Sequence, residues 1–241
     1  MNKARLFSNI SIAAIYILLK ARTRVVLPPA FLCCGYPAQV NAKSATQSRE
    51  VLQNAIIFSQ IREMLGYLSF DACVVSCGTC REALHQMDMQ EIFGCGIHDV
   101  CGFVLKTGVK INSGETCLYH RPCHDSLDGQ AEALLEACGY RIAPVSHCCS
   151  EAGTLSLSRP DISNAMLARK RRALSKNIGD SGHSGIKLLT HCPSCIQGLG
   201  RNTNLNVIPR HITEELAIQI GGKNWKNEAG KLVQNAERII F

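Results

Sequence analysis

A repeated arrangement of cysteines constrains the fold of this chain more than any other feature of its sequence. Each copy has two adjacent cysteines and, after 42 intervening residues, a Cys-x-x-Cys step. A shift of 115 residues superimposes the first copy on the second and also places Pro29 on Pro144. The eight cysteines related in this way are Cys33, Cys34, Cys77 and Cys80 in the first copy and Cys148, Cys149, Cys192 and Cys195 in the second. Such agreement in spacing indicates a tandem duplication of one ancestral fold.

The hydrophobic pattern predicts the same order of elements in both copies. Each copy begins with an amphipathic helix and a short apolar strand that ends at a proline, and the Cys-Cys turn follows. A long helix, a second apolar strand, the Cys-x-x-Cys step and another helix complete the copy. The expected helices are 10–21, 48–68, 81–86, 130–138, one that starts within 158–161, and 196–199, and the expected strands are 24–27, 72–75, 140–143 and 186–189. Because strands and helices alternate, we expect an α/β fold made of two tandem, pseudo-symmetric, cysteine-rich repeats.

The two copies also define the expected domain limits. Both end alike, with a final helix after His98-Asp99-Val100 in the first copy and after His211-Ile212-Thr213 in the second. We therefore place repeat 1 at residues 1–110 and repeat 2 at 111–221. Residues 222–241 are expected to form a solvated C-terminal tail.

The 14 cysteines of the chain favour metal ligation over disulfide bonds. Disulfide frameworks are typical of short secreted chains, and adjacent cysteines do not easily bridge each other. Thiolates that hold a metal must be kept from oxidising, which predicts a cytoplasmic protein. The apolar run from Ile10 to Leu19 is too short to span a bilayer, and basic residues rather than a small-residue cleavage site follow it.

One further cysteine, Cys123, makes the two copies unequal. In the second copy it is expected to join the Cys-Cys and Cys-x-x-Cys residues, and five thiolates exceed a closed tetrahedral zinc site but suit an iron–sulfur cluster. The corresponding position in the first copy is Ser8, and no cysteine precedes Cys33. Two interpretations are open, in which the true start lies upstream or the first site is degenerate. Cys73 is a weak substitute for the missing ligand.

Several phrases around these cysteines resemble the cysteine-rich "CCG" domain found in the cysteine-rich subunit of heterodisulfide reductase and in the iron–sulfur subunits of glycolate and lactate oxidation. In that family a leading Cys, a Cys-Cys-Gly and a Cys-x-x-Cys occur twice in tandem. The phrases are Phe31-Leu-Cys-Cys-Gly-Tyr-Pro37, Tyr119-His-Arg-Pro-Cys-His124 and Cys149-Ser-Glu-Ala-Gly-Thr-Leu155. Glu151-Ala-Gly-Thr-Leu-Ser-Leu-Ser-Arg-Pro-Asp-Ile162 resembles the C-terminal part of long bacterial fusions with a flavin-linked 2-hydroxyacid dehydrogenase. Ser150 departs from the family pattern, which has glycine there.

The resemblance implies an iron–sulfur electron-transfer module of an oxidoreductase. Clusters of the 4Fe-4S type would be held by all nine cysteines named above, and zinc is an alternative at the first site. Electrons would pass between a flavin-containing dehydrogenase of the lactate or glycolate type and a quinone or disulfide acceptor. Because this chain has no Gly-x-Gly-x-x-Gly or Walker-type loop, FAD is expected only on an upstream domain or a partner.

Two alternative functions follow from the same cysteines. The first is a non-catalytic zinc module with a closed four-thiolate site in the first copy. The second is a thiol–disulfide catalyst similar to heterodisulfide reductase, with its activity at the second site. We expect the chain to be part of an oxidoreductase rather than a complete enzyme by itself.

Charged and polar residues add weaker signals. The net charge is +7, and the basic run Arg169-Lys170-Arg171-Arg172 is expected on a solvated helix face, with docking to an acidic partner or to the inner face of the cell membrane as the alternative. No aromatic or finger motif supports nucleic acid binding. Histidines near the second site are expected to shape the pocket or donate to sulfurs, and the remaining cysteines to be structural. These residues are His120, His124, His147 and His191, and Cys95, Cys101, Cys117 and Cys138.

Overall fold

The second repeat is built on a four-stranded parallel sheet. The computed structural model describes residues 3–29, 32–40, 44–66, 69–151, 155–178 and 185–235. The strands β3 (Thr116–Tyr119), β4 (Arg141–Pro144), β5 (Ile186–Thr190) and β6 (Val207–His211) lie in the order β4-β3-β5-β6, all parallel. Parallel neighbours require crossover connections, and helices supply them here. They are α7 (Ala131–Ala137), α8 (Leu155–Ser158), α9 (Pro160–Ile178) and α10 (Pro193–Gly200).

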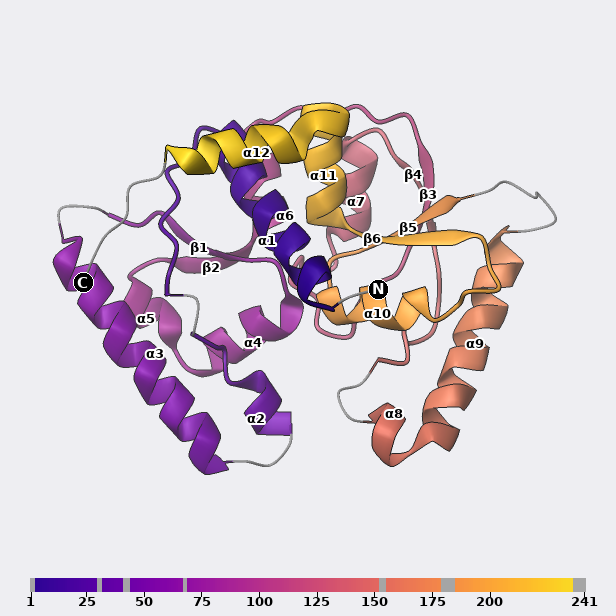
Figure 1. Ribbon diagram of the computed structural model, residues 1–241, viewed down its shortest axis with the longest axis horizontal. Coiled ribbons are helices and arrows are strands. Elements are labelled where there is room, and N and C mark those ends of the chain that lie inside the picture. The colour runs from indigo at the N-terminus through magenta and orange to yellow at the C-terminus, as the bar shows by residue number, and fades with distance from the viewer. Residues whose placement is uncertain are drawn as a thin grey trace.

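The first repeat follows a similar order of elements but has a smaller sheet, without counterparts of β3 and β4 among its described residues. Its helices are α1 (Lys3–Lys20), α2 (Tyr36–Val40), α3 (Ser44–Met64), α4 (Gly78–Gln86), α5 (Met89–Phe93) and α6 (Val100–Lys106). Its strands β1 (Ala72–Val75) and β2 (Gly96–Asp99) pair in parallel. Figure 1 shows the two sheets on either side of a central group of helices, with α3 and α9 as corresponding outer legs. The predicted α/β fold with two tandem repeats is therefore confirmed.

The predicted strand at 24–27 is wrong. These residues have no strand assignment, although the equivalent β4 of the second repeat is a strand. The reason lies in the pairing, because β4 is held by β3 and the described part of the first repeat has no counterpart of β3. An extended segment without a hydrogen-bonded neighbour does not form a sheet.

A shared hydrophobic core joins the repeats at the centre of the molecule. It contains residues of α1 and α6 from the first repeat and of β3 and α11 (Ile212–Gly221) from the second. Tyr16, Val104, Tyr119 and Leu216 are all fully buried in it. Since neither repeat closes this core alone, the two repeats bury their apolar faces against each other.

The expected solvated tail contains a helix, most of whose residues are exposed, that contacts the core through two buried residues. A short 3-10 turn (Gly222–Asn224) leads into α12 (Trp225–Gln234), and Trp225 and Ala229 are buried. Trp225 lies 5.9 Å from Tyr16 of α1, measured between ring centroids. An i, i+4 apolar pair is enough to dock a helix, and this pair gives α12 its buried stripe. The last part of the predicted tail, 236–241, lies outside the described residues.

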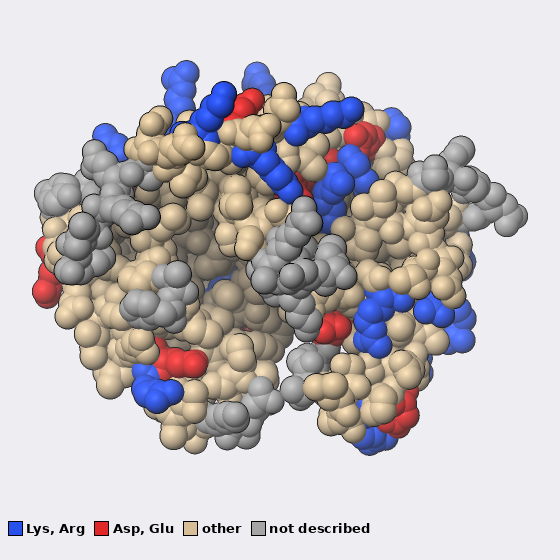
Figure 2. All heavy atoms as spheres, viewed as in Figure 1, with Lys and Arg blue, Asp and Glu red and all other residues tan. Residues whose placement is uncertain are grey.

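The surface follows the same division into two halves. Figure 2 shows it notched between the lower ends of the two repeats, while Lys and Arg gather along the edge formed by α12 and over α9. No helix among the described residues combines the length and apolarity needed to cross a membrane.

Candidate metal centre

Both Cys-x-x-Cys steps begin a helix at the carboxyl end of a strand. Cys77 is the N-cap of α4 and directly precedes it, and Cys192 is the N-cap of α10. Both have extended backbone conformations, with φ of −153° and −128°. The predicted position of these cysteines at helix N-termini is therefore found. Backbone amides and the helix dipole favour thiolates at such a position.

Both Cys-Cys pairs are followed by a residue in the left-handed backbone conformation. Gly35 has φ of +76° and Ser150 has φ of +63°. Only glycine adopts this region without steric cost, which explains a glycine after the pair in the first copy. Ser150 keeps the same turn, and its hydroxyl donates to the Cys149 carbonyl at 2.6 Å. The departure from glycine therefore leaves the turn intact.

Nine cysteines form one continuous row of contacting thiols. Each lies within hydrogen-bonding reach of the next, and the first Cys of each Cys-x-x-Cys step meets its counterpart at the middle. The order is Cys33, Cys34, Cys80, Cys77, Cys192, Cys195, Cys149, Cys148, Cys123, and we call these residues the thiol row. The row is symmetric about the contact of Cys77 with Cys192, except that Cys123 has no equivalent beside Cys33.

Three members of the thiol row have lowered pKa values because neighbouring thiols donate hydrogen bonds to them. Thiol groups of Cys192 and Cys80 donate to Cys77 and lower its pKa far below the usual value. Donation from Cys123 and then Cys149 lowers the pKa of Cys148 in the same way. Donation from Cys80 lowers the pKa of Cys34 to about 7. The other six thiols of the row have raised pKa values, so binding of a metal, which takes thiolates, would release their protons.

A buried lysine and a buried histidine flank the second half of the row. Lys170 is fully buried in α9 and donates through Nζ to Nδ1 of His120 at 3.0 Å and to three carbonyls, those of Val145, Ser146 and His147. Burial, and after it the charge of Lys170, lowers the pKa of His120 to about 3. The neutral imidazole therefore accepts at Nδ1 and carries its proton at Nε2.

The tautomer of His120 determines whether its Nε2 atom can act as a hydrogen-bond donor or as a metal ligand. A ligating nitrogen of His120 lies within 4.8 Å of the sulfurs of Cys149 and Cys195, and all three residues are buried. Its Nε2 has no hydrogen-bond partner among the described residues. Because Nε2 carries the proton while Nδ1 is engaged by Lys170, His120 in this tautomer is a hydrogen-bond donor and not a metal ligand.

Two further histidines tie the surrounding loops together. His191 is fully buried, with Tyr119 Oη at 3.2 Å from Nδ1 and Asp125 Oδ1 at 2.9 Å from Nε2. His124 contacts the first repeat, with Tyr36 Oη at 2.9 Å from Nε2 and Glu82 beside Nδ1. The predicted pocket-shaping role fits both residues, whereas His147 is exposed and contributes only its carbonyl.

The remaining cysteines lie outside the thiol row. Cys101, Cys117 and Cys138 are buried, as expected for structural residues, and Cys95 is half-buried. Cys73 interacts with Cys95 and, among the described residues, with no thiol of the row, so it does not take the place of the missing ligand.

Sequence reasoning missed Lys170, which it placed on a solvated face. The error has a physical cause, because the buried stripe of α9 follows Ser163, Lys170 and Leu174 at helical spacing. The sequence carried a signal of this burial, because the polar Ser163 and Lys170 lie at helical spacing on the same face as the apolar Leu174.

A comparison with protein-family models agrees with this geometry. The model of a family described as "CCG: Cysteine-rich domain" matches residues 1–85 and 115–200. The chain belongs to this CCG cysteine-rich domain family. No curated protein sequence matches it significantly. Among solved structures, glutamate racemase isoform RacE1 from Bacillus anthracis matches at 15% identity with a TM-score of 0.34, covering 94% of this chain and 78% of the racemase. A score so low carries no argument about fold or function.

The donor set of this CCG protein fits a sulfur-ligated metal group. Within the described residues the thiol row contributes sulfur only, with the cationic Lys170 beside its second half. Thiolates select zinc and iron–sulfur clusters over hard oxygen-preferring cations. Five thiols on one side of the central contact exceed a tetrahedral zinc site, and four on the other side equal one.

Proposed function

We propose that this protein is an iron–sulfur electron-transfer module of an oxidoreductase. The observation that carries the proposal is the continuity of the thiol row across both repeats. Cys123, Cys148, Cys149, Cys192 and Cys195 would hold one group, and Cys33, Cys34, Cys77 and Cys80 the other. An iron–sulfur cluster supplies reversible one-electron chemistry when it is bound.

The protein's own residues support that role by controlling charge and solvent. Cys149, Cys192 and Cys195 are buried, so water is kept from this part of the row. Lys170 places a positive charge near these sulfurs, and a cation stabilises the more negative, reduced state of any group held there. The Nε2–H of His120 offers a donor to sulfur, which acts in the same direction.

The electron donor and acceptor are part of this proposal. We place the donor as a flavin-linked dehydrogenase of 2-hydroxyacids such as lactate or glycolate, and the acceptor as a quinone or a disulfide. The support is the similarity of the segment from Glu151 to Ile162 to dehydrogenase fusions of this family. The basic surface over α9 and α12 suits an acidic docking partner.

Metal and sulfide analysis tests the proposal. The full chain is purified under anaerobic conditions, reconstituted with ferrous iron and sulfide, and analysed for iron, zinc and acid-labile sulfide. We expect iron and sulfide to be retained, and Cys195→Ser to lower both. The matched control is Cys95→Ser, which changes a half-buried cysteine outside the row and should leave both unchanged.

Two results would contradict the proposal. A colourless protein without acid-labile sulfide after reconstitution would exclude an iron–sulfur cluster. One equivalent of zinc without sulfide, lost in Cys80→Ser, would favour the structural zinc module in the first repeat instead.

A further inference from the structure

The two halves of the thiol row have ionisable neighbours of opposite charge. The helices α3 and α9 are corresponding elements of the two repeats (Figure 1), and each brings one such side chain to the Cys-Cys turn of its own repeat. In α9 this residue is Lys170, and in α3 it is Glu50. The electrostatic surroundings of the halves therefore differ although the thiols themselves repeat.

Lys170 lies against the second half of the row. Its Nζ is 3.2 Å from the carbonyl oxygen of His147, the residue before the Cys-Cys pair, and 3.0 Å from Nδ1 of His120. A ring nitrogen of His120 in turn lies within 4.8 Å of the sulfurs of Cys149 and Cys195. Among the described residues no carboxylate contacts Lys170, so its charge acts on these sulfurs without compensation.

The contacts of Lys170 require its protonated form. Besides the imidazole, Nζ has three carbonyl oxygens at 2.9–3.2 Å, those of Val145, Ser146 and His147. Carbonyl oxygens only accept hydrogen bonds, and an ammonium group supplies three N–H donors. Loss of the proton would leave buried acceptors without a donor, which costs free energy. Lys170 is therefore a fixed positive charge.

Glu50 lies against the first half of the row. Its Oε2 is 3.4 Å from the position that a Cβ on Gly35 would take, directly after the Cys33-Cys34 pair. This oxygen is buried and has no hydrogen-bond partner among the described residues. Burial raises the pKa of the Cys33 thiol, and the charge of Glu50 raises it further. The next buried side chain of α3, Asn54, is neutral and donates to the Cys33 carbonyl at 2.6 Å.

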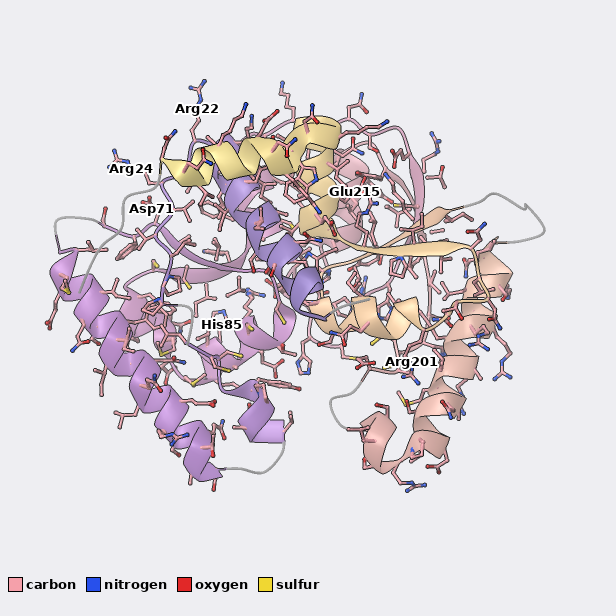
Figure 3. All side chains as sticks on the ribbon, viewed as in Figure 1. Arg22, Arg24, Asp71, His85, Arg201 and Glu215 are labelled. Carbon is pink, nitrogen blue, oxygen red and sulfur yellow. The ribbon has the colours of Figure 1, made fainter. Side chains whose placement is uncertain are left out.

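Other charged groups beside the second half are offset by their own partners. Figure 3 shows Arg201 below α10, and Glu151 lies 3.9 Å from its guanidinium. Asp125 accepts from His191 at 2.9 Å and from two backbone amides. Lys170 is thus the charge that distinguishes this half from the first.

We propose that Lys170 and Glu50 give the two halves of the row unequal affinities for an added electron, with the second half favoured. An electron adds one negative charge to the group that a half would hold, and a buried cation attracts this charge while a carboxylate repels it. One electron is taken up from a donor, and no bond of the chain forms or breaks. The inference rests on the proposed iron–sulfur function and goes beyond it by ranking the two halves.

Redox titration of the reconstituted full chain measures this ranking. Dithionite supplies the electrons, and electron paramagnetic resonance follows the reduced groups. Cys80→Ser and Cys195→Ser each remove a ligand from one half and so assign the signals. We expect reduction in two steps, with the half that contains Cys195 reduced first. A single step, or the reverse order, would overturn the proposal.

Variants of the two charges test their roles. Lys170→Gln keeps a hydrogen-bond donor but removes the charge, and should make reduction of the second half at least tenfold less favourable, which is about 59 mV for one electron. Glu50→Gln should make reduction of the first half more favourable by at least about threefold. The controls Lys176→Gln and Glu63→Gln remove exposed charges from the same helices and should shift neither half.

The pattern of shifts separates an electrostatic role from a structural one. A residue that only supports the fold would not shift one half alone, nor would two such residues shift opposite halves in opposite directions. Charge variants with the same potentials as their controls would overturn the proposal.

Cobalt binding tests the same charges without an iron–sulfur cluster. Lys170→Gln is measured with Cys80→Ser and Glu50→Gln with Cys195→Ser, so that one intact half of the metal-free chain takes up Co²⁺. At constant pH we expect Lys170→Gln to tighten binding at least tenfold and Glu50→Gln to weaken it, as thiolate-to-cobalt absorption reports. Unchanged affinities would overturn the inference even in a chain that retains iron and sulfide. Both shifts in a chain that retains neither would count against the proposed function alone.

Discussion

At the scale of single residues, the buried Lys170 and the half-buried Asp125 lie beside the second half of the thiol row, and each has its partners set by local geometry. Lys170 directs its ammonium at His120 and at three carbonyls, which fixes the tautomer of the imidazole. Asp125 accepts from His191 and from the amides of Leu127 and Gly129. The loop that carries Cys123 is thus held by a charged side chain.

The lowered pKa of Asp125 makes the stability of the folded protein depend on pH. Burial alone would raise the pKa of its carboxyl, but the bond from His191 and the two amides more than offset this and lower the pKa to about 2. Between about pH 4 and pH 2 the unfolded state binds a proton that the folded state does not, so stability is lost as the pH falls through this window. Acid titration of urea unfolding should show a loss on the order of 2 kcal/mol that is absent in Asp125→Asn. The exposed Asp88→Asn serves as the control for the loss of one surface carboxylate and should keep the acid loss of the parent protein.

At the scale of elements, the helices after the Cys-x-x-Cys steps approach neighbouring backbone closely. A Cβ added to Gly78 of α4 would lie 1.8 Å from the carbonyl oxygen of His124. A Cβ added to Gly198 of α10 would lie 2.3 Å from that of Cys149. These contacts bring the Cys123 and Cys149 loops onto the helices that begin at Cys77 and Cys192, which is why the thiols meet.

Gly78→Ala should therefore disturb the contact between repeats. The backbone has to move, and overpacking of this kind costs about 1–3 kcal/mol. Urea unfolding measures the loss, and chemical analysis should show less bound metal. Gly200→Ala in α10 is the matched control, because its Cβ meets no atom within 4 Å. A Gly78→Ala protein as stable as the control would contradict this account of α4.

The docking of α12 is a second property at this scale. Trp225 is 3% exposed and packs on Tyr16, whose hydroxyl donates to Glu228 at 2.8 Å. Trp225→Ala should lower the free energy of unfolding by about 3 kcal/mol, as for other buried aromatic residues. Leu232→Ala, at a 39% exposed position of the same helix, should cost much less. If both variants unfolded alike, α12 would be a tail rather than part of the core.

At the scale of the whole molecule, the thiol row divides the 14 cysteines into nine that belong to the row and five that lie outside it. Alkylation at pH 6 of the metal-free protein should modify the thiolates of Cys77 and Cys148 ahead of the buried Cys101, Cys117 and Cys138. Metal loading should then protect the row and leave Cys95 and Cys73 unaffected. Peptide mapping by mass spectrometry measures the extent of alkylation at each cysteine. Unchanged reactivity of the row after metal loading would contradict its role as the ligand set.

The sequence by itself determined the repeat and part of the order of elements, whereas the strands β2, β3 and β6 were not expected from it. Period and spacing are local properties, so the expected strands at 72–75, 140–143 and 186–189 and the helix start near Pro160 agree closely with β1, β4, β5 and α9. Cysteine spacing also determined which residues gather in each repeat, because each Cys-x-x-Cys step follows a strand end.

Tertiary structure alone decided how the repeats relate. The contact of Cys77 with Cys192 depends on two helices packing across a shared core, which no spacing within one repeat expresses. Lys170 and Trp225 are buried by distant partners, and the segment 24–27 fails to become a strand because its neighbour is missing. Long-range pairing and burial depend on which surfaces meet in the fold, and the local pattern of a sequence does not contain that information.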